Sequence, residues 1–171
     1  MSEPRPEEQL GPVLQFMRVL WGLDHSLQMA SKRMEARLGI TGPQRLVVRL
    51  VGQFPGISAG ELASLQKVHP STLTGVLRRL EARSILKRRS DPADGRRALL
   101  HLTAKGVRLN ELRSGTVEEA VQRAIGKLDA GQLDGAQNAI VGLMQELEEQ
   151  AVEADRETRG AAAKAPTRTR R

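Results

Sequence analysis

The chain has 171 residues, and 27 lysines and arginines against 20 acidic residues give it a net charge of +7. This length suits one domain, at about 100–200 residues per domain, and 39% hydrophobic with 27% charged residues is typical of a folded protein. The absence of cysteine excludes disulfides, thiolate zinc sites, iron–sulfur clusters and thiol nucleophiles. No apolar run approaches the roughly 20 residues that span a bilayer, and the acidic start is unlike a signal peptide, so we expect a cytoplasmic protein without membrane contact.

The N-terminal part of the chain predicts a tail and one long helix. Residues 1–9 are polar and contain proline, so we expect a mobile tail. Residues 10–40 have helical periodicity with two apolar stripes, which a single helix buries only if part of it meets a second subunit. The first stripe comprises Val13, Met17, Leu20, Leu27, Met34 and Leu38, and the second comprises Phe16, Val19 and Leu23.

Three shorter helices and a hairpin are expected in residues 41–103. Capping boxes predict a helix from Thr41 that ends before Phe54 and another from Ser58, and His69-Pro70-Ser71 starts a helix that runs to about Arg83. In the first two helices we expect inward side chains at Leu46, Val47, Leu50, Val51, Leu62 and Leu65. Strands are predicted at Ile85–Arg89 and Arg97–Leu102, because the segment between them contains Asp-Pro and Asp-Gly turns.

The C-terminal part predicts two further helices and a second tail. Thr103 caps a helix that reaches about Lys127, and Asp129 with Gln132 starts the next one. We assign residues 104–153 to C-terminal dimerisation helices. From Ala154 the helical pattern is lost, so residues 154–171 are expected to be a disordered basic tail.

Positive charge is concentrated in the middle of the chain. From Lys67 to Arg108 there are eleven basic and three acidic residues, a net charge of +8, which favours a polyanionic partner. None of the three aromatic residues lies in this stretch. Proteins that bind single strands usually interleave cations with stacking rings, so double-stranded DNA is the expected partner.

The helix after His69 has one apolar and one polar face. At 100° per residue, Leu73, Val76, Leu77 and Leu80 share the inward face. The outward face is small and hydroxylic, then cationic, which suits insertion into a major groove about 12 Å wide. Its residues, the first set of expected DNA contacts, are Ser71, Thr72, Thr74, Gly75, Arg78 and Arg79.

The hairpin supplies the second set of expected DNA contacts. Its tip carries Asp94, Gly95 and Arg96, and a thin tip bearing arginine can enter a minor groove about 6 Å wide. Asp94 could fix the direction of the Arg96 guanidinium by a charge-assisted hydrogen bond. Arg88 and Arg97, one on each strand, complete the set.

These motifs resemble those of a known family. The segments 58–63, 71–74 and 77–81, and above all the run Asp91-Pro92-Ala93-Asp94-Gly95-Arg96 with Leu102-Thr103-Ala104-Lys105-Gly106, resemble the MarR family of bacterial transcription regulators. The resemblance implies a mainly α fold with a small β-hairpin wing, that is, a winged helix-turn-helix with N- and C-terminal dimerisation helices. It also implies a homodimeric, sequence-specific regulator, in most cases a repressor, on a pseudo-palindromic operator. Ser84 stands where the family usually has glycine, so we expect a less relaxed turn there.

The same family often responds to a small aromatic anion bound between the dimerisation and DNA-binding regions. Trp21, His25 and Met29 follow at four-residue steps in the first helix and share a face. They are the candidate ligand-binding residues, for a planar anion. The alternative is that Trp21 and Met29 are core or dimer contacts.

Other classes of function find less support. His25, His69 and His101 are scattered, so we expect no metal site. The chain has no glycine-rich phosphate loop after a strand, no serine elbow and no His-Glu-x-x-His, so we expect neither an enzyme nor a cofactor. An architectural DNA-binding protein of weak sequence specificity is the alternative, because the C-terminal tail is basic.

Overall fold

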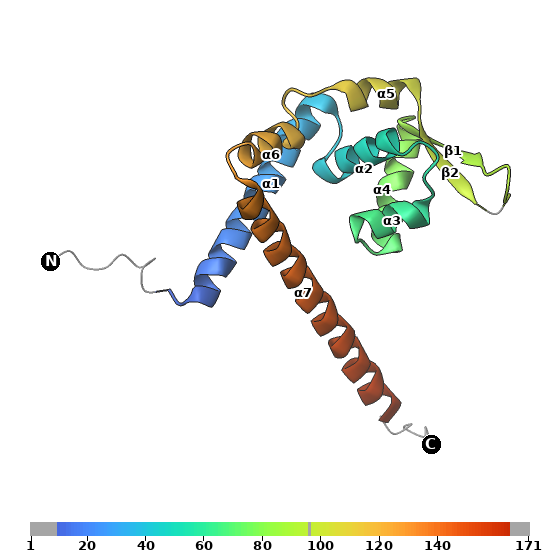
Figure 1. Ribbon diagram of the computed structural model, residues 1–171. Coiled ribbons are helices and arrows are strands. Elements are labelled where there is room, and N and C mark those ends of the chain that lie inside the picture. Colours follow the sequence, from blue (N-terminus) through green and yellow to red (C-terminus); the bar gives the residue numbers. More distant parts are fainter. Residues whose placement is uncertain (1–9, 96, 165–171) are drawn as a thin grey trace, which may run out of the picture. The chain divides into compact units, whose positions relative to one another are not determined.

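The fold is mainly helical, with one two-stranded antiparallel hairpin among the parts that the structure describes (Figure 1). The computed structural model describes residues 10–95 and 97–164. The chain divides into two compact units, one up to Val121 and one from Gln122 onward. The elements are α1 (Pro12–Leu38), α2 (Gly42–Gln53), α3 (Ala59–Gln66), α4 (Pro70–Ala82), β1 (Leu86–Ser90), β2 (Ala98–Leu102), α5 (Ala104–Glu111), α6 (Val117–Ile125) and α7 (Ala130–Lys164).

The starts of α2, α3 and α4 are those that the sequence predicts. Thr41 and Gln44 form one capping box and Ser58 and Glu61 another, so the free amides of each first turn are bonded. His69 is the N-cap of α4, where its Nδ1 atom accepts a hydrogen bond from the amide of Ser71. A single apolar core joins these helices to the hairpin, and it consists of Ile40, Val47, Val48, Val51, Leu62, Ala63, Leu73, Leu77, Leu80, Ile85, Leu86 and Leu100.

Two of the expected core residues are in fact exposed. Leu46 keeps 48% and Leu65 keeps 49% of its surface accessible, so both expectations are wrong. In α2 the buried side is turned toward Val48 and Arg45, because α5 contacts the helix in addition to α4 and β2. In α3 the contacts are with α4 and β2, which cover Leu62 and Ala63 and leave Leu65 open.

The hairpin is anchored to the helical part by main-chain hydrogen bonds. Leu86 pairs with Leu102 and Arg88 with Leu100 in the antiparallel register. The amide of Gly56 donates to the carbonyl of Leu100 over 2.9 Å, and that of Leu100 donates to Ile57 over 3.0 Å. The segment before α3 therefore acts as a short third strand, which fixes the direction of the wing relative to the helices.

The helix expected from Thr103 to Lys127 is interrupted. It ends at Glu111, and α6 begins at Val117 after a turn in which Gly115 has a φ of +69°. The amide of Glu119 donates to the Thr116 hydroxyl, and the Glu119 carboxylate accepts from the Gly115 amide. The glycine and the Thr116–Glu119 spacing are a helix-start signal within the sequence that outweighs the continuous helical periodicity.

The C-terminal helix is longer than expected. We expected disorder from Ala154, but α7 continues to Lys164, and residues 165–171 lie outside the described part. Residues 154–164 contain four alanines, two arginines, one glutamate and one lysine, residue types with high helix propensity that need no apolar stripe. The N-terminal tail at residues 1–9 also lies outside the described part.

The long helix α1 exposes most of its apolar side chains. Met34 is buried, whereas much of both predicted stripes is open to solvent. Of the helices that the structure describes, none combines the length and the apolar character that crossing a bilayer requires. The large apolar residues exposed on α1 are Val13, Leu14, Phe16, Met17, Val19, Trp21, Leu23, Leu27 and Met29.

Candidate nucleic-acid interface

Helix α4 has the two faces that its sequence predicts. Leu73, Leu77 and Leu80 are at most 2% exposed, and Val76 packs against the same core. All six residues that we assign to DNA contact on this helix are exposed: Ser71, Thr72, Thr74, Gly75, Arg78 and Arg79. A Cβ atom added to Gly75 would meet nothing within 4 Å, so the backbone itself is the surface at this point.

Two hydroxyls on this face already have partners within the protein. The Thr74 hydroxyl donates to the carbonyl of Pro70 over 2.8 Å, and the Ser71 hydroxyl lies 2.7 Å from Nδ1 of His69. Their lone pairs remain able to accept hydrogen bonds, for example from the amino groups of bases. Arg78 and Arg79 form no ion pair with any residue in the described ranges, so their guanidinium groups are available to an anion.

Main-chain hydrogen bonds close the turn that joins the two strands of the wing. The Asp91 amide donates to the carbonyl of Arg97 over 3.0 Å, and the Arg97 amide donates to that of Asp94 over 2.9 Å. The Asp91 carboxylate accepts from the amide of Ala93, which is the hydrogen bond of an Asx turn. Arg96 lies outside the described residues, so its pairing with Asp94 stays a prediction.

The other two wing arginines are held by carboxylates. Nε of Arg88 lies 2.5 Å from Oε1 of Glu81 in α4, and Nη2 of Arg97 lies 2.9 Å from Oε1 of Glu61 in α3. Hydrogen bonds from the Ser58 side chain and amide, and then Arg97, lower the pKa of Glu61. The spacing of Ser58 and Glu61 indicates a capping box, but neither ion pair has a sequence signal, because a sequence does not show which acids a hairpin will fold against.

The link from α4 to β1 runs through Ser84, which has a φ of +55°. The Ser84 amide donates to the carbonyl of Glu81 over 2.8 Å and the Ile85 amide to that of Leu80 over 2.9 Å, which is the Schellman pattern. Ser84 therefore adopts the left-handed conformation, which is unfavourable for a residue with a side chain and agrees with the less relaxed turn expected here. Gly106 then packs so closely that an added Cβ atom would lie 2.3 Å from the Ile85 carbonyl oxygen.

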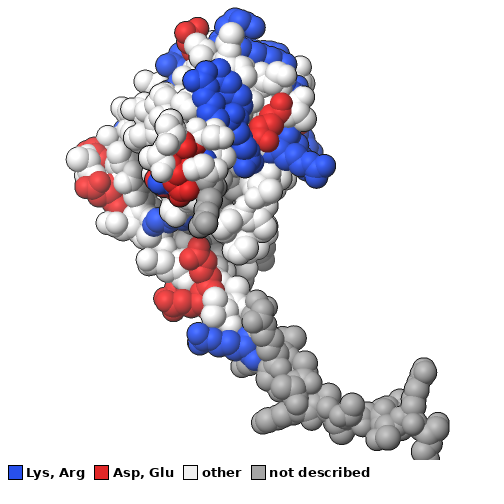
Figure 2. All heavy atoms as spheres, turned by 90° about the vertical axis from the view of Figure 1, so that its right-hand side faces the viewer, with Lys and Arg blue, Asp and Glu red and all other residues white. Residues whose placement is uncertain are grey.

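Basic side chains dominate the outer surface of the helix-turn-helix and wing, residues 41–103, which form one lobe of the protein. Figure 2 views the molecule from the side of the hairpin and shows lysine and arginine gathered over its upper part, with few carboxylates between them. The exposed basic residues of this region include Arg78 and Arg79 on α4 and Lys87, Arg88 and Arg89 on β1. Since α4 and β1 pack against each other, two elements present one cationic surface.

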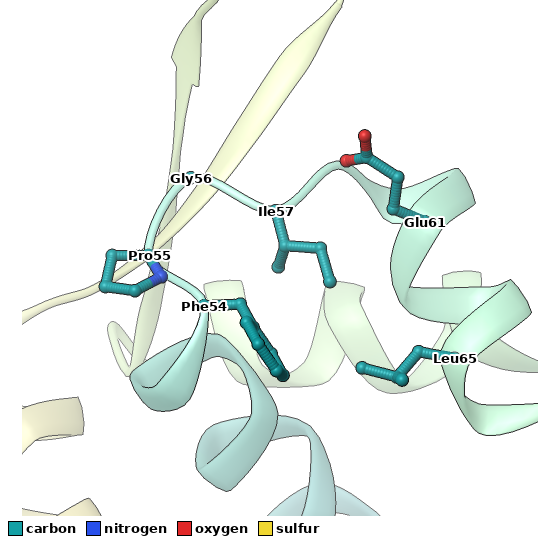
Figure 3. Close-up of a pocket in the computed structure, with 6 residues that line it drawn as sticks. All are labelled: Phe54, Pro55, Gly56, Ile57, Glu61 and Leu65. Carbon is teal, nitrogen blue, oxygen red and sulfur yellow. The ribbon is translucent and has the colours of Figure 1, made fainter.

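The candidate ligand residues lie at four-residue steps on one face of α1. Trp21, His25 and Met29 are all exposed on α1. An apolar hollow of about 490 Å³ lies between the end of α2 and α3, lined by Phe54, Pro55, Gly56, Ile57, Glu61 and Leu65 (Figure 3). Its charged lining residue is an acid, Glu61, so this hollow does not favour the anionic ligand that the sequence suggests.

The described residues hold no cluster of three histidine, aspartate or glutamate side chains that could bind a metal ion. His69 caps α4 and His101 lies in β2, as their positions in the sequence predict.

Comparison with known proteins assigns this lobe to a family. Residues 40–98 match the model of the MarR family. The chain is 35% identical over 95 residues to the HTH-type transcriptional repressor Rv2887 of Mycobacterium tuberculosis, covering 56% of this chain and 68% of that one. The chain belongs to the MarR family. It is therefore one of a family of DNA-binding transcription regulators and not of enzymes.

Two further comparisons agree with this MarR-family assignment. The transcriptional regulator HosA of Escherichia coli O157:H7 is 31% identical over 91 residues, which cover 53% of this chain and 67% of HosA. The structure of a MepR–DNA complex from S. aureus superposes with a TM-score of 0.66 at 19% identity, covering 80% of this chain and 99% of that chain. At that identity the structural similarity concerns the fold, which is the winged helix.

Proposed function

We propose that this MarR-family protein is a homodimeric repressor that binds a pseudo-palindromic operator in a sequence-specific manner. In each half-site, α4 enters the major groove and the wing tip with Arg96 reaches the adjacent minor groove. The observation that carries the proposal is the outward face of α4, where small and hydroxylic residues precede Arg78 and Arg79, which form no ion pair within residues 10–95 and 97–164. The MepR structure, which is a complex with DNA, and the repressor Rv2887 support it.

The exposed apolar side chains of α1 support the dimer. Val13 is 69% and Trp21 63% exposed in one chain, and an apolar stripe of this kind is stable in water only when another surface covers it. A second copy of the chain is the covering surface that we propose. Light scattering should then give twice the mass of one chain, which is 18.7 kDa.

We propose further that a small aromatic anion relieves repression by binding near Trp21, His25 and Met29. Trp21 is the only tryptophan of the sequence, so its fluorescence reports on this face. Aromatic carboxylates should change that fluorescence and weaken operator binding together. If neither changes across a panel of such compounds, the ligand proposal fails while the DNA-binding proposal stands. As a regulator acts where the chromosome lies, we propose that the protein works in the cytoplasm.

Selection of bound duplexes from a random pool tests the main proposal. A sequence-specific regulator should yield a palindromic consensus and bind it at least about a thousandfold more tightly than random duplex at the same salt concentration. A ratio near one would instead support the architectural DNA-binding protein. Affinity for random duplex alone does not discriminate, since phosphate contacts give it to both classes.

A further inference from the structure

Three arginines bind the turn that joins α5 to α6. Nη2 of Arg37 donates to the carbonyl of Ser114 over 2.6 Å, and Nη2 of Arg45 donates to that of Leu112 over 2.6 Å. Nη1 of Arg45 is bonded to the Leu109 carbonyl, and Nη1 of Arg49 to the carbonyl and the side-chain oxygen of Asn110 at 3.0 and 2.8 Å. We call Arg37, Arg45 and Arg49 the arginine clasp.

The clasp supplies hydrogen-bond donors to main-chain carbonyls at the end of α5 and in the turn that follows. The last carbonyls of a helix have no partner within its regular hydrogen-bond pattern, and α5 ends at Glu111. Leu109 accepts from the amide of Leu112 and Asn110 from the Arg113 side chain, and the clasp adds a second donor to each of these carbonyls. Guanidinium groups at this end also interact favourably with the helix dipole. The clasp therefore replaces water around an interruption of the helix, and it holds the interruption in one geometry.

Arg45 is the buried centre of the clasp. Its side chain is 1% exposed, and its Nε lies 2.8 Å from Oε1 of Glu118 in α6. Nε of Arg49 lies 3.6 Å from the same oxygen. A buried charge is tolerated only with its partners in place, so the position of the start of α6 relative to α2 is strongly determined.

The clasp also joins the two places where the chain enters and leaves the DNA-binding lobe. Arg37 lies in the last turn of α1, directly before the residues that lead into α2, and its partner Ser114 lies in the turn that leads out to α6. Arg45 and Arg49 belong to α2, which packs on the recognition helix α4. A rotation of the lobe about its two connections would break these hydrogen bonds.

We propose that the arginine clasp sets the orientation of the recognition lobe (the helix-turn-helix and wing, residues 41–103) relative to α1. This orientation in turn determines which spacing of two half-sites the protein accepts. The inference rests on the proposed homodimer and its operator. Each base pair inserted between two half-sites moves them by about 3.4 Å and turns them by about 34°. A dimer with fixed lobes loses one half-site when the spacing changes, whereas a dimer with loosened lobes can follow the change at little cost.

Arg45 is unsuitable for the test, since it is buried and its removal takes the nearest cation from Glu118 and the guanidinium donor from the Leu112 carbonyl, so that unfolding of the variant would obscure the result. The double variant R37M/R49M removes the two outer arms, which are exposed and partly exposed, and keeps the aliphatic length. R33M is the matched control, because Arg33 is exposed on α1 and has no hydrogen bond to residues 109–114. Each protein is titrated by fluorescence anisotropy against the selected palindrome, duplexes with one or two base pairs inserted or removed at its centre, and a single half-site.

The expected result is a change in the spacing profile. The wild type and R33M should lose about tenfold in affinity for each base pair of altered spacing, and R37M/R49M about threefold or less, while binding to the single half-site is equal. An unchanged profile in R37M/R49M overturns the inference, and so does an equal loss on all duplexes, which would indicate only fewer folded molecules. A wild type that accepts every spacing equally refutes the proposed operator-binding dimer itself.

Discussion

Nη2 of Arg97 in the wing donates a hydrogen bond to Oε1 of Glu61 in α3 over 2.9 Å, while Oε2 of the same carboxylate accepts from the amide and the hydroxyl of Ser58. One side chain therefore caps a helix of the helix-turn-helix and fixes the wing beside it. Together with the Gly56–Leu100 hydrogen bond, this places α4 and the hairpin tip in a constant relationship before any DNA is bound.

The stability that Glu61 contributes should depend on pH. Hydrogen bonds from Ser58, and then Arg97, lower the pKa of Glu61, so its contribution is present above about pH 4.3, the ordinary glutamate pKa. It is lost as the pH falls through the lower value of the folded state. We expect the difference in free energy of unfolding between wild type and E61Q to be largest above about pH 5 and to shrink toward pH 3. Urea unfolding at a series of pH values measures it, with E148Q on α7 as control.

Arg78 should read a base. It is exposed on the outward face of α4 and forms no ion pair within the described residues. R78A should cost about 1–3 kcal/mol on the selected palindrome and relax the preference at one position of each half-site. Repeating the duplex selection with R78A measures both, and R33A on α1 is the control. A loss of equal size on random duplex would make Arg78 a phosphate contact.

Glycine at position 75 should lower the stability of the protein and raise its affinity for DNA. Glycine in a helix interior costs about 1 kcal/mol relative to alanine, and nothing surrounds the position, so G75A should raise the free energy of unfolding by about that amount. The added methyl group should nevertheless weaken binding to the palindrome by about tenfold, because it holds the backbone away from the groove floor.

G135A is the matched control for G75A, since Gly135 is an exposed helical glycine of α7 with equally open surroundings. It should gain stability and keep its DNA affinity. If G75A binds as tightly as the wild type, α4 does not approach DNA at this residue.

Replacement of Ser84 by glycine should stabilise the protein without changing its affinity for DNA. The left-handed conformation destabilises the folded state by about 1–2 kcal/mol for a residue with a side chain, and glycine avoids this strain. Glycine also loses more conformational entropy on folding, which cancels part of that advantage. S84G should therefore raise the free energy of unfolding by about 0.5–1 kcal/mol and leave DNA affinity unchanged. S84A, which keeps the strain, should bring no gain. Thermal or urea unfolding distinguishes the two variants.

The basic C-terminus should add affinity without specificity. Residues 165–171 contain three arginines, Arg168, Arg170 and Arg171. Truncation after Lys164 leaves α7 whole and should weaken palindrome and random duplex by similar factors. It should also flatten the log–log dependence of affinity on salt by about 0.9 per lost phosphate contact. Loss of affinity for the palindrome alone would show instead that these residues take part in recognition.

Local patterns of the sequence determined much of this protein. Caps at Thr41, Ser58 and His69, the apolar face of α4 and the Asp-Pro and Asp-Gly turns depend on neighbours a few residues apart, and all are found in the structure. For the same reason the outward face of α4 could be predicted, whereas the less relaxed turn at Ser84 follows as an expectation only from the family resemblance.

Tertiary structure alone decided which groups pair across long stretches of chain. Arg97 meets Glu61 across 36 positions and Arg45 meets Glu118 across 73, because packing of whole elements brings them together. It also decided that Leu46 and Leu65 stay exposed, since helical periodicity defines an apolar stripe but not the neighbours that cover it. The direction of the recognition lobe belongs to this second group, because most partners of the guanidinium groups on which it depends are main-chain carbonyls, and these carry no sequence signal.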